Sequence, residues 1–247
     1  MKQIKFSICT ASLFMLMSCV DLNLNPLSEG SSENWYSSQA EIEMSLNDFY
    51  RTDFFPIDDM KWGDDVTARN ETSAVNNGTL TSEDGTIAKR WENYYKGIAR
   101  ALRIINNMDR ARAMGVSEKD IAQYEGEAYF YLGYAYGMLA FHWGDAILDK
   151  VGMSLDEAYT ASRSPKADVL AYSYECLDKA AERLPNSYPG IQRATKGAAY
   201  AFKARIAIYN EDYAAAATAA KNCMDLNVYK LHSNYQDLFT ASWSDEW

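Results

Sequence analysis

Residues 124–144 read YEGEAYFYLGYAYGMLAFHWG, and this stretch decides the fold. Apolar and aromatic side chains recur in it every three to four positions, which is the period of one helix face. Small residues alternate with rings, and this combination lets two helices approach closely with few voids. Ser117 provides a helix cap before the stretch and Gly144 a stop after it. We therefore expect a long helix from about 117 to 143 that packs tightly against its neighbours.

Similar periodicity predicts further helices on both sides of this one. Ser38 and Glu41 have the spacing of a capping box, which starts a helix over residues 38–52. Pro165 suits the first position of another helix, which Pro185 ends. The expected helices, in chain order, cover residues 38–52, 88 to about 115, 117–143, 165–184, 195–209 and 212–226.

The last two expected helices form about one unit of a repeat with a 34-residue period. Tyr213 and Ala216 match the start of the second helix of a tetratricopeptide repeat. Ala220 and Val228 depart from that pattern, because it prefers a bulky ring at the first position and proline at the second. The predicted fold class is mainly all-α: a tetratricopeptide-like helix-pair scaffold with long irregular excursions.

Several side chains on the helical stripes are expected in the core. Leu132 and Ile105 should lie in seams between helices. Cys176 and Cys223 lie inside helical patterns, which favours buried free thiols but leaves a disulfide open. The aromatic residues predicted in the core are Trp91, Tyr94, Tyr131 and Trp143.

The first eighteen residues have the features of a secretory signal peptide. Lys2 and Lys5 make a positive start, residues 6–17 are apolar, and Ser18 provides a small residue at the cleavage position. Cys19 follows directly, as in a lipoprotein lipobox, so we expect cleavage before Cys19 and its acylation, with palmitate among the chains. An ordinary signal peptide with an incidental cysteine is the alternative. Residues 19–37 then read as a lipidated tether and extended lead-in, and residues 38–247 as the helical domain.

Charge restricts the class of partner. The chain has 247 residues and a formal net charge of −10, which argues against nucleic acid because phosphates require a positive surface. Neutral ligands such as sugars remain compatible with it. No segment after the leader has the roughly 18 consecutive apolar residues of a transmembrane helix.

The sequence lacks the motifs of common enzymes. It contains two histidines and no H-E-x-x-H, G-x-G-x-x-G or G-x-S-x-G pattern, so we expect no catalysis, metal or cofactor. The carboxylate pairs 58–59 and 64–65 could be imagined as a glycosidase dyad, which needs carboxyls facing one another across about 5–10 Å. Adjacent carboxylates in a loop more often form turns or contact a cation.

Residues 53–87 have no sustained period and form a long irregular excursion, punctuated by glycines. Within it, residues 62–77 combine a ring that could stack on a sugar with side chains that could bond its hydroxyls. The alternative is that Trp62 packs on the scaffold and the polar residues form turns. The candidate ligand-binding residues are Trp62, Asp64, Arg69, Asn70, Asn76 and Asn77.

Taken together, four stretches resemble the SusD/RagB family of surface glycan-binding lipoproteins of the Bacteroidetes. They are the lipobox cysteine with residues 24–26 and the first helix, residues 91–107, residues 125–145, and residues 184–216. The resemblance implies a non-catalytic scaffold on the cell outer membrane that acts as a lid over a TonB-dependent SusC-type transporter. It also implies that part of the ligand site lies in the irregular region before the helix that contains Trp91.

The chain departs from the resembling family in length, since its members are usually about twice as long (cf.). We therefore interpret it as an N-terminal portion, incomplete at the C-terminus. The function implied is capture of oligosaccharide and its delivery to the transporter, and we expect a neutral sugar. A tetratricopeptide-like protein-interaction scaffold, or a peptide-capturing lipoprotein, is the alternative.

Overall fold

The computed structural model describes residues 35–56 and 74–236. The chain divides into one unit of residues 1–35 and another of residues 36–247, and every described residue except Trp35 belongs to the second. Its described part is helical, with one isolated antiparallel bridge between Ala146 and Ser164, so the mainly all-α prediction is confirmed. The elements are α2 (Gln39–Asn47), η1 (Asp48–Tyr50), α3 (Gly85–Asn106), α4 (Met108–Ala113), α5 (Glu118–Trp143), α6 (Leu155–Thr160), α7 (Lys166–Arg183), α8 (Lys196–Tyr209) and α9 (Tyr213–Asp225).

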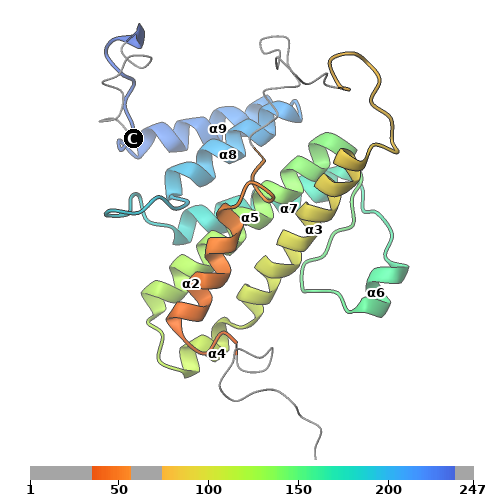
Figure 1. The fold of residues 1–247 in the computed structure, drawn as a ribbon. Coiled ribbons are helices and arrows are strands. Elements are labelled where there is room, and N and C mark those ends of the chain that lie inside the picture. The colour runs from red at the N-terminus through yellow and green to blue at the C-terminus, as the bar shows by residue number, and fades with distance from the viewer. Residues whose placement is uncertain (1–34, 57–73, 237–247) are drawn as a thin grey trace, which may run out of the picture. The chain divides into compact units, whose positions relative to one another are not determined.

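The long helix α5 lies at the centre (Figure 1). It packs against α3 and α7 and also contacts α2, α4 and α8. Helix α7 packs in turn on α8, and α8 on α9. The tight connection expected between the last two helices is present, because the Asp212 N–H donates to the Ala207 carbonyl at 2.9 Å. The helices thus form a series of neighbouring pairs, as the repeat pattern predicted.

Glycines of α5 allow its neighbours to approach its backbone. A Cβ on Gly133 would lie 2.5 Å from Leu177 Cγ and 2.9 Å from the Ser173 carbonyl oxygen, both on α7. The Ser173 hydroxyl also donates to the Gly133 carbonyl at 2.6 Å. A Cβ on Gly137 would lie 2.5 Å from a terminal carbon of Ile206, on α8. The close helix approach predicted from the small residues is therefore confirmed.

The aromatic residues of the core meet where α2 and η1 cover α5. The ring of Phe49 stacks on Tyr131 with centroids 4.7 Å apart, and Tyr94 and Tyr131 are buried as predicted. Trp91 and Trp143 are only half-buried, so their expected place in the core is wrong. Their ring centroids lie 5.3 Å apart, near the start of α3 and the end of α5. Side chains near a helix terminus are covered by fewer neighbours than those in the middle.

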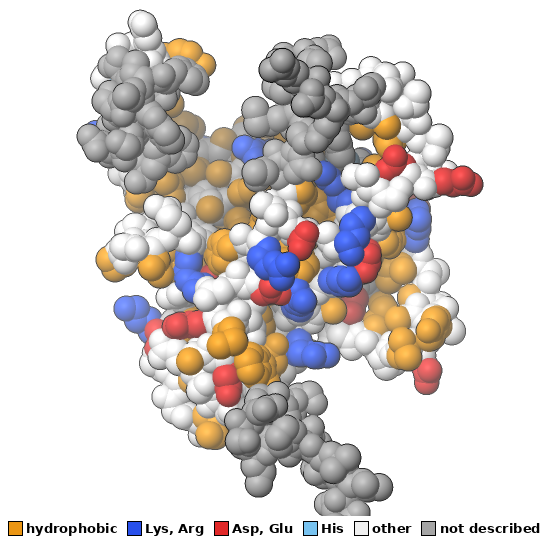
Figure 2. All heavy atoms as spheres, viewed as in Figure 1, with side chains coloured by type: hydrophobic (Ala, Val, Ile, Leu, Met, Phe, Trp, Pro, Cys, Tyr) orange, Lys and Arg blue, Asp and Glu red, His pale blue; other side chains and the backbone are white. Residues whose placement is uncertain are grey.

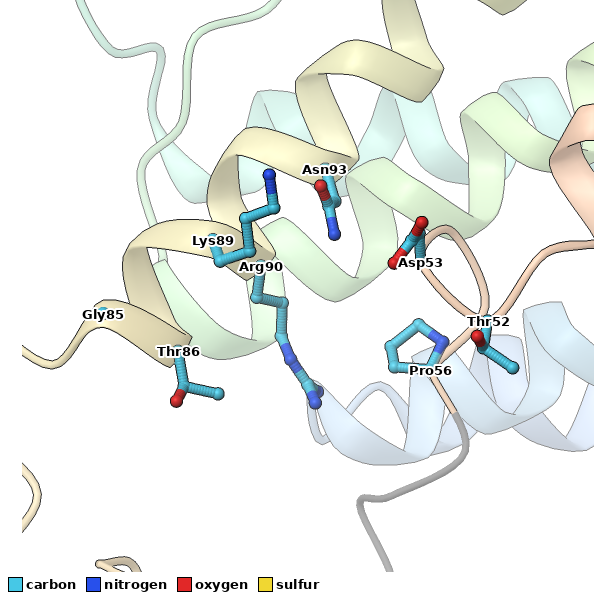
Figure 3. A pocket seen from close by; sticks show the side chains of 8 residues that line it. All are labelled: Thr52, Asp53, Pro56, Gly85, Thr86, Lys89, Arg90 and Asn93. Carbon is cyan, nitrogen blue, oxygen red and sulfur yellow. The ribbon is translucent and has the colours of Figure 1, made fainter.

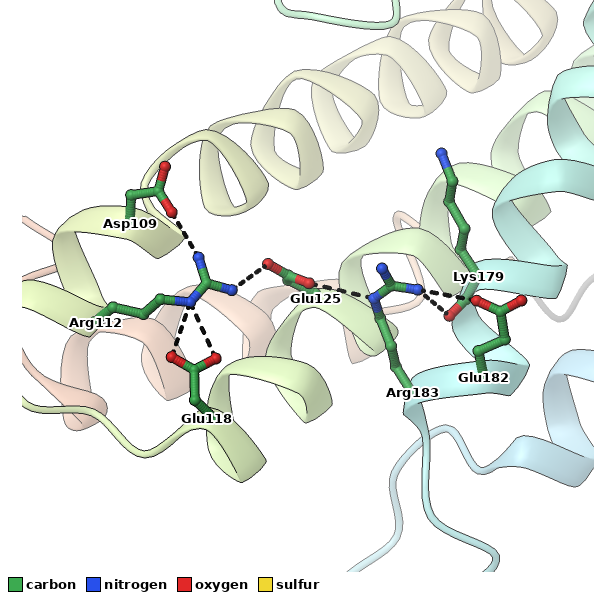
Figure 4. Close-up of polar contacts among 7 residues, drawn as sticks. All are labelled: Asp109, Arg112, Glu118, Glu125, Lys179, Glu182 and Arg183. Carbon is green, nitrogen blue, oxygen red and sulfur yellow. Dashed lines mark hydrogen bonds and ion pairs between the residues drawn. The ribbon is translucent and has the colours of Figure 1, made fainter.

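An ion-pair network joins α4, α5 and α7 (Figure 4). Arg112 pairs with Asp109 at 2.6 Å, with Glu118 at 3.1 Å and with Glu125 at 3.2 Å. Glu125 also pairs with Arg183 of α7 at 3.2 Å. The Glu125 side chain is 17% exposed, so this bridging carboxylate is shielded from solvent more than a typical surface pair.

The boundaries of the predicted helices differ from the structure around α3. The helix starts at Gly85 rather than Ala88, because the Asp84 carboxylate accepts a hydrogen bond from the Thr86 N–H at 2.8 Å and caps it. The predicted single helix to about residue 115 breaks at Asn107, and α4 follows.

Near its C-terminus, the buried face of α3 lies one position away from the predicted one. Leu132 is buried as predicted, whereas Ile105 is half-buried and its neighbour Ile104 faces the core. The predicted helix over 38–52 is α-helical only to Asn47 and continues as the short turn η1.

Helix α6 was not predicted, because no residue of it is buried and its pattern has no apolar stripe. It stands on a loop held by the scaffold. The Tyr136 hydroxyl donates to the Asp149 carbonyl at 2.7 Å, and the Tyr95 hydroxyl donates to the Ile147 carbonyl at 2.9 Å.

Cys176 is buried on α7 and Cys223 is half-buried on α9, and both thiols are free rather than joined. Among the described residues, every helix is too short or too polar to cross a bilayer.

Candidate functional site

Most residues of the predicted ligand site lie outside the described ranges. These are Trp62, Asp64, Arg69 and Asn70, and the lipidation residue Cys19 lies outside them too. Asn76 and Asn77 are described, and both are exposed. The Asn77 carboxamide oxygen accepts hydrogen bonds from the Thr79 N–H at 3.1 Å and the Thr79 hydroxyl at 2.6 Å. Asn77 therefore closes a local turn, as the alternative interpretation of this segment expected for the polar residues.

A hollow of about 490 Å³ lies where the irregular excursion leaves and rejoins the scaffold (Figure 3). Thr52, Asp53 and Pro56, just before the undescribed residues 57–73, form one wall. The first turns of α3 form the other wall, with Gly85, Thr86, Lys89, Arg90 and Asn93. Figure 3 shows Asn93 and Asp53 facing one another across the hollow. The Arg90 side chain extends away from Asn93, on the side of the hollow where Pro56 lies.

The wall formed by Thr52, Asp53 and Pro56 is held in place by a buried ring. Phe54 is 4% exposed and meets Tyr131 of α5 edge to face at 5.9 Å, while the Arg100 guanidinium covers it at 4.9 Å. The N–H groups of Phe54 and Phe55 both donate to the Arg51 carbonyl at 3.0 Å. This turn places Thr52 and Asp53 on the surface side, because the ring that follows them points into the core.

The wall on α3 follows from helix spacing. Thr86, Arg90 and Asn93 are separated by four and three positions, so they lie on one face of the helix. Sequence reasoning missed Arg90 and Asn93, because they fall inside a predicted helix, whereas the predicted ligand residues all belong to the aperiodic segment. The signal that could have found them is this polar row on the first turns of a helix that directly follows a long excursion.

Carboxylates and cations around the hollow pair with one another. Asp48 pairs with both Arg51 (3.0 Å) and Arg100, so one carboxylate is shared by two cations. Asp53, on the wall, pairs with Arg51 at 3.2 Å. Figure 2 shows the Lys and Arg side chains gathered over α3 and the segment after α2, in the middle of the face viewed.

Glu92, beside the hollow, is shared in the same way between Lys96 and Lys89, the second at 3.1 Å. Hydrogen bonds from Lys96 and then from Lys89 lower its pKa, so Glu92 stays ionised and does not act as a proton donor at neutral pH.

The described side chains that line the hollow are mostly hydrogen-bonding groups. Among the described residues that line the hollow, Asp53 is the one carboxylate, and a glycosidase needs two. No cluster of three or more His, Cys, Asp or Glu side chains in the described ranges is placed to hold a metal ion. The walls offer a guanidinium, an ammonium, a carboxamide and hydroxyls, which are the donors and acceptors that sugar hydroxyl groups bond.

A second hollow, of about 440 Å³, is apolar and lies between α8 and α9. Ala204 and Ala220 are among its lining residues, and Ile208 and Met224 beside them are exposed. Cys223 also lines it, and the Cys223 thiol donates a hydrogen bond to the Gly197 carbonyl at 3.5 Å.

The family described as starch-binding proteins that associate with the outer membrane matches residues 30–208, which is well over half of the chain. The chain belongs to the SusD/RagB family. Its relatives include SusD-like proteins P2 and P38 of Formosa agariphila, which are 23% and 26% identical to it. These alignments cover 93% and 92% of this chain but 48% and 47% of the relatives, so the chain spans about half their length.

Solved structures of the family share the fold. A SusD-like carbohydrate-binding protein of Bacteroides fragilis matches with a TM-score of 0.70 and 23% identity, over 83% of this chain and 44% of that one. A structure determined with a xylogluco-oligosaccharide matches with a TM-score of 0.64 and 19% identity, over 81% and 43% of the two chains.

Proposed function

We propose that this chain is the N-terminal portion of a surface lipoprotein that captures oligosaccharide and delivers it to a TonB-dependent SusC-type transporter. Membership of a starch-binding family associated with the outer membrane supports the class of ligand and the location. The observation that carries the proposal on this chain is the polar hollow at the base of the excursion, which has hydrogen-bonding side chains and no second carboxylate among its described lining residues. The protein binds its ligand and leaves it chemically unchanged.

In this proposal the excursion and the hollow form one binding region. Trp62 supplies a flat ring for the apolar face of a sugar, and Arg69 and Asn70 bond its hydroxyls. Asp64 and Asn76 contribute further polar atoms from the excursion, and Asn77 does so only if its turn opens. Arg90 and Asn93 on α3 add a rigid floor, because their backbone belongs to a helix packed on α5.

The location follows from the leader. Acylation of Cys19 anchors the mature chain to the outer membrane, facing outward, with residues 19–37 as a tether. The transporter then receives the sugar from a lipoprotein held at the same surface.

The test is binding of immobilised and soluble oligosaccharides to the protein and its variants. Trp62→Ala, Arg69→Ala and Asn93→Ala should each lower affinity about tenfold or more, because a lost stacking ring or buried hydrogen-bond partner costs about 1–3 kcal/mol. Asn222→Ala on α9 is the control, because Asn222 is exposed and does not line the hollow. Unchanged affinity in all variants would place the site elsewhere, and binding of peptides but no glycan would favour the peptide-capturing alternative.

A further inference from the structure

Among the described residues, the apolar hollow between α8 and α9 is left open. Helix α9 is the last of the described helices and packs against α8 (Figure 1). Two side chains that line the apolar hollow, Ile208 of α8 and Met224 of α9, are 55% and 69% exposed. Exposed apolar side chains that gather in one patch mark a surface that binds another apolar group.

The chain returns to this helix pair after α9. The Tyr229 hydroxyl lies 2.9 Å from the Thr195 hydroxyl, directly before α8. The Tyr229 ring also lies against Gly197, where a Cβ would overlap it. Cys223, which lines the apolar hollow, donates to the Gly197 carbonyl at 3.5 Å. The residues that follow Tyr229 therefore start close to the apolar hollow.

A helical turn begins a few residues later. The Asn234 side-chain oxygen accepts a hydrogen bond from the Gln236 N–H at 3.2 Å, which is the bond that an N-cap residue makes to the second residue of a helix. Tyr235 and Gln236 form the described start of this turn. Tyr235, Leu238 and Phe239 have the spacing i, i+3 and i+4, which predicts one apolar face of a helix. The cap and the spacing together indicate an amphipathic turn whose remainder lies outside the described residues.

We infer that residues 237–247 of this chain cover the apolar hollow, with Leu238 and Phe239 as the side chains that enter it. This is the mode in which an amphipathic helix lays its apolar face in a groove. An apolar cavity of about 150 Å³ holds a benzene ring, so the apolar hollow of about 440 Å³ has room for both side chains. The docking does not require the glycan proposed above.

The length of the connecting chain suits this docking. An extended chain from Tyr229 to Leu238 spans up to about 30 Å, whereas α8 is about 20 Å long. Leu238 can therefore reach every part of the apolar hollow. A short tether also gives the segment an effective concentration in the millimolar range, which favours it over a second copy of the chain.

Charge also suits the segment to this place. Residues 237–247 contain three carboxylates and no Lys or Arg. Arg205 lines the apolar hollow, and its guanidinium lies over the Phe202 ring at 5.3 Å. It makes no ion pair with another described residue, so it supplies a cation to an acidic segment that docks beside it.

Alkylation of Cys223 measures the cover, because this thiol lines the apolar hollow. A segment that covers the thiol in about nine molecules of ten slows its reaction about tenfold, since only the open form reacts. Joint replacement of Leu238→Ala and Phe239→Ala in the full chain should therefore raise the Cys223 rate about tenfold. Thr240→Ala is the matched control, because position 240 falls off the apolar face of the turn and the rate should stay at the wild-type value.

Cys176 is the internal reference, because it is buried on α7 and does not line the apolar hollow. Its slow labelling in each variant reports an intact fold. Cys223 remains the faster of the two thiols throughout, since the segment opens and closes over it. An unchanged Cys223 rate in the double variant, with Cys176 still protected, would overturn the inference.

Disulfide trapping identifies the occupant independently of labelling rates. With oxidised glutathione as oxidant, Phe239→Cys should join Cys223 within one chain, because docking brings the two positions within the range that a disulfide spans. Thr240→Cys is the control and should join Cys223 more slowly. Peptide mapping and non-reducing electrophoresis read the result. A bond from position 239 to Cys223 of another chain would assign the apolar hollow to a second copy, and no such bond at all would place the segment elsewhere. Either result would overturn the inference.

Discussion

Glu127 shows at the scale of one residue how the scaffold tolerates a buried charge. Its side chain is 1% exposed, and its carboxylate accepts hydrogen bonds from the Tyr50 hydroxyl and from Arg193, both at 2.8 Å, and from Gln123 at 3.2 Å. The Tyr50 hydroxyl also accepts from the Ala194 N–H at 2.9 Å. One side chain of α5 thus ties the segment after α2 to the loop before α8.

Replacing this carboxylate should cost much of the stability of the domain. Glu127→Gln leaves the Arg193 guanidinium without its buried ionic partner, and breaking a buried pair costs about 3–5 kcal/mol. Urea unfolding monitored by circular dichroism measures the loss. The control is Glu175→Gln, because Glu175 pairs with Lys179 on an exposed face of α7, where a pair is worth about 0–1 kcal/mol. Equal urea midpoints for the two variants would show that the buried pair contributes no more to the free energy of unfolding than the exposed pair.

The two helical thiols should differ in reactivity. Burial raises the pKa of Cys176 to about 12, so at pH 8 only about one thiol in ten thousand is ionised. Burial raises the pKa of Cys223 as well, but this thiol is half-buried and lines the apolar hollow between α8 and α9. Alkylation followed by peptide mass mapping should therefore modify Cys223 before Cys176. Faster labelling of Cys176 would contradict the burial of α7.

The Cys176 thiol should make the folded state less stable as pH rises into the alkaline range. Because the folded-state pKa of Cys176 is raised above the unfolded value, the folded chain keeps a proton that the unfolded chain loses in alkaline solution. Its contribution is fully present below the ordinary thiol pKa of about 8.5 and is lost as pH rises toward 12. Cys176→Ala should therefore flatten the alkaline decline in stability.

At the scale of elements, the contact between α5 and α7 should not tolerate one added methyl group. Gly133→Ala would place a carbon 2.5 Å from Leu177 Cγ, and overpacking of this kind costs about 1–3 kcal/mol. Gly85→Ala is the matched control, because nothing lies within 4 Å of its Cβ position and it sits at the start of α3. The control should unfold at the wild-type temperature or slightly above, and the Gly133 variant well below. A shared melting temperature would mean that the two helices are further apart than the structure places them.

How well an element could be predicted depended on whether it buries a face. Helix α5 could be predicted because its apolar and small residues repeat along its whole length and meet neighbours on several sides. Helix α6 could not, since it buries no residue; in the structure it begins with a capping box formed by Ser154 and Glu157. Ile105 was predicted in the core, but its neighbour Ile104 is buried there instead. Periodicity locates the buried face of a helix only to within about one position, because it does not show which neighbouring helix covers that face.

At the scale of the whole molecule, the sequence predicted the family, but none of the predicted ligand residues is among the described residues that line the hollow. The excursion was recognised from its lack of period, whereas Arg90 and Asn93 come to the hollow through the packing of α3 beside the turn at residues 51–56. Contacts between segments about 35 positions apart depend on tertiary packing, and one sequence carries no direct signal for them. The half-length match to relatives has a related effect, since any ligand residue on their remaining half is outside this chain.

Anchoring can be tested on the whole protein. Cys19→Ala should abolish acylation and release the protein into the soluble fraction, because each acyl methylene contributes about 0.8 kcal/mol to membrane binding and the anchor would be gone. Metabolic labelling with palmitate and cell fractionation report the two effects. Ser18→Ala, which keeps a small residue before the cysteine, is the control and should still be labelled. Label and membrane association that persist in the alanine variant at position 19 would contradict the lipobox.

The glycines of α5 have a consequence for how this fold can change over time. Where Gly133 and Gly137 meet α7 and α8, the absence of a Cβ lets Leu177 and Ile206 lie against the backbone of α5, so the helices approach this closely only while both positions stay glycine. The geometry of the layers is thus fixed at a few points, and the rest of the surface is free to vary without moving them. A structure that is 23% identical and still superposes with a TM-score of 0.70 is what such a framework permits. In a saturation mutagenesis map, Gly133 and Gly137, which do not line the hollow, should be as intolerant to replacement as residues of a binding site. The residues that line the hollow should tolerate more substitutions.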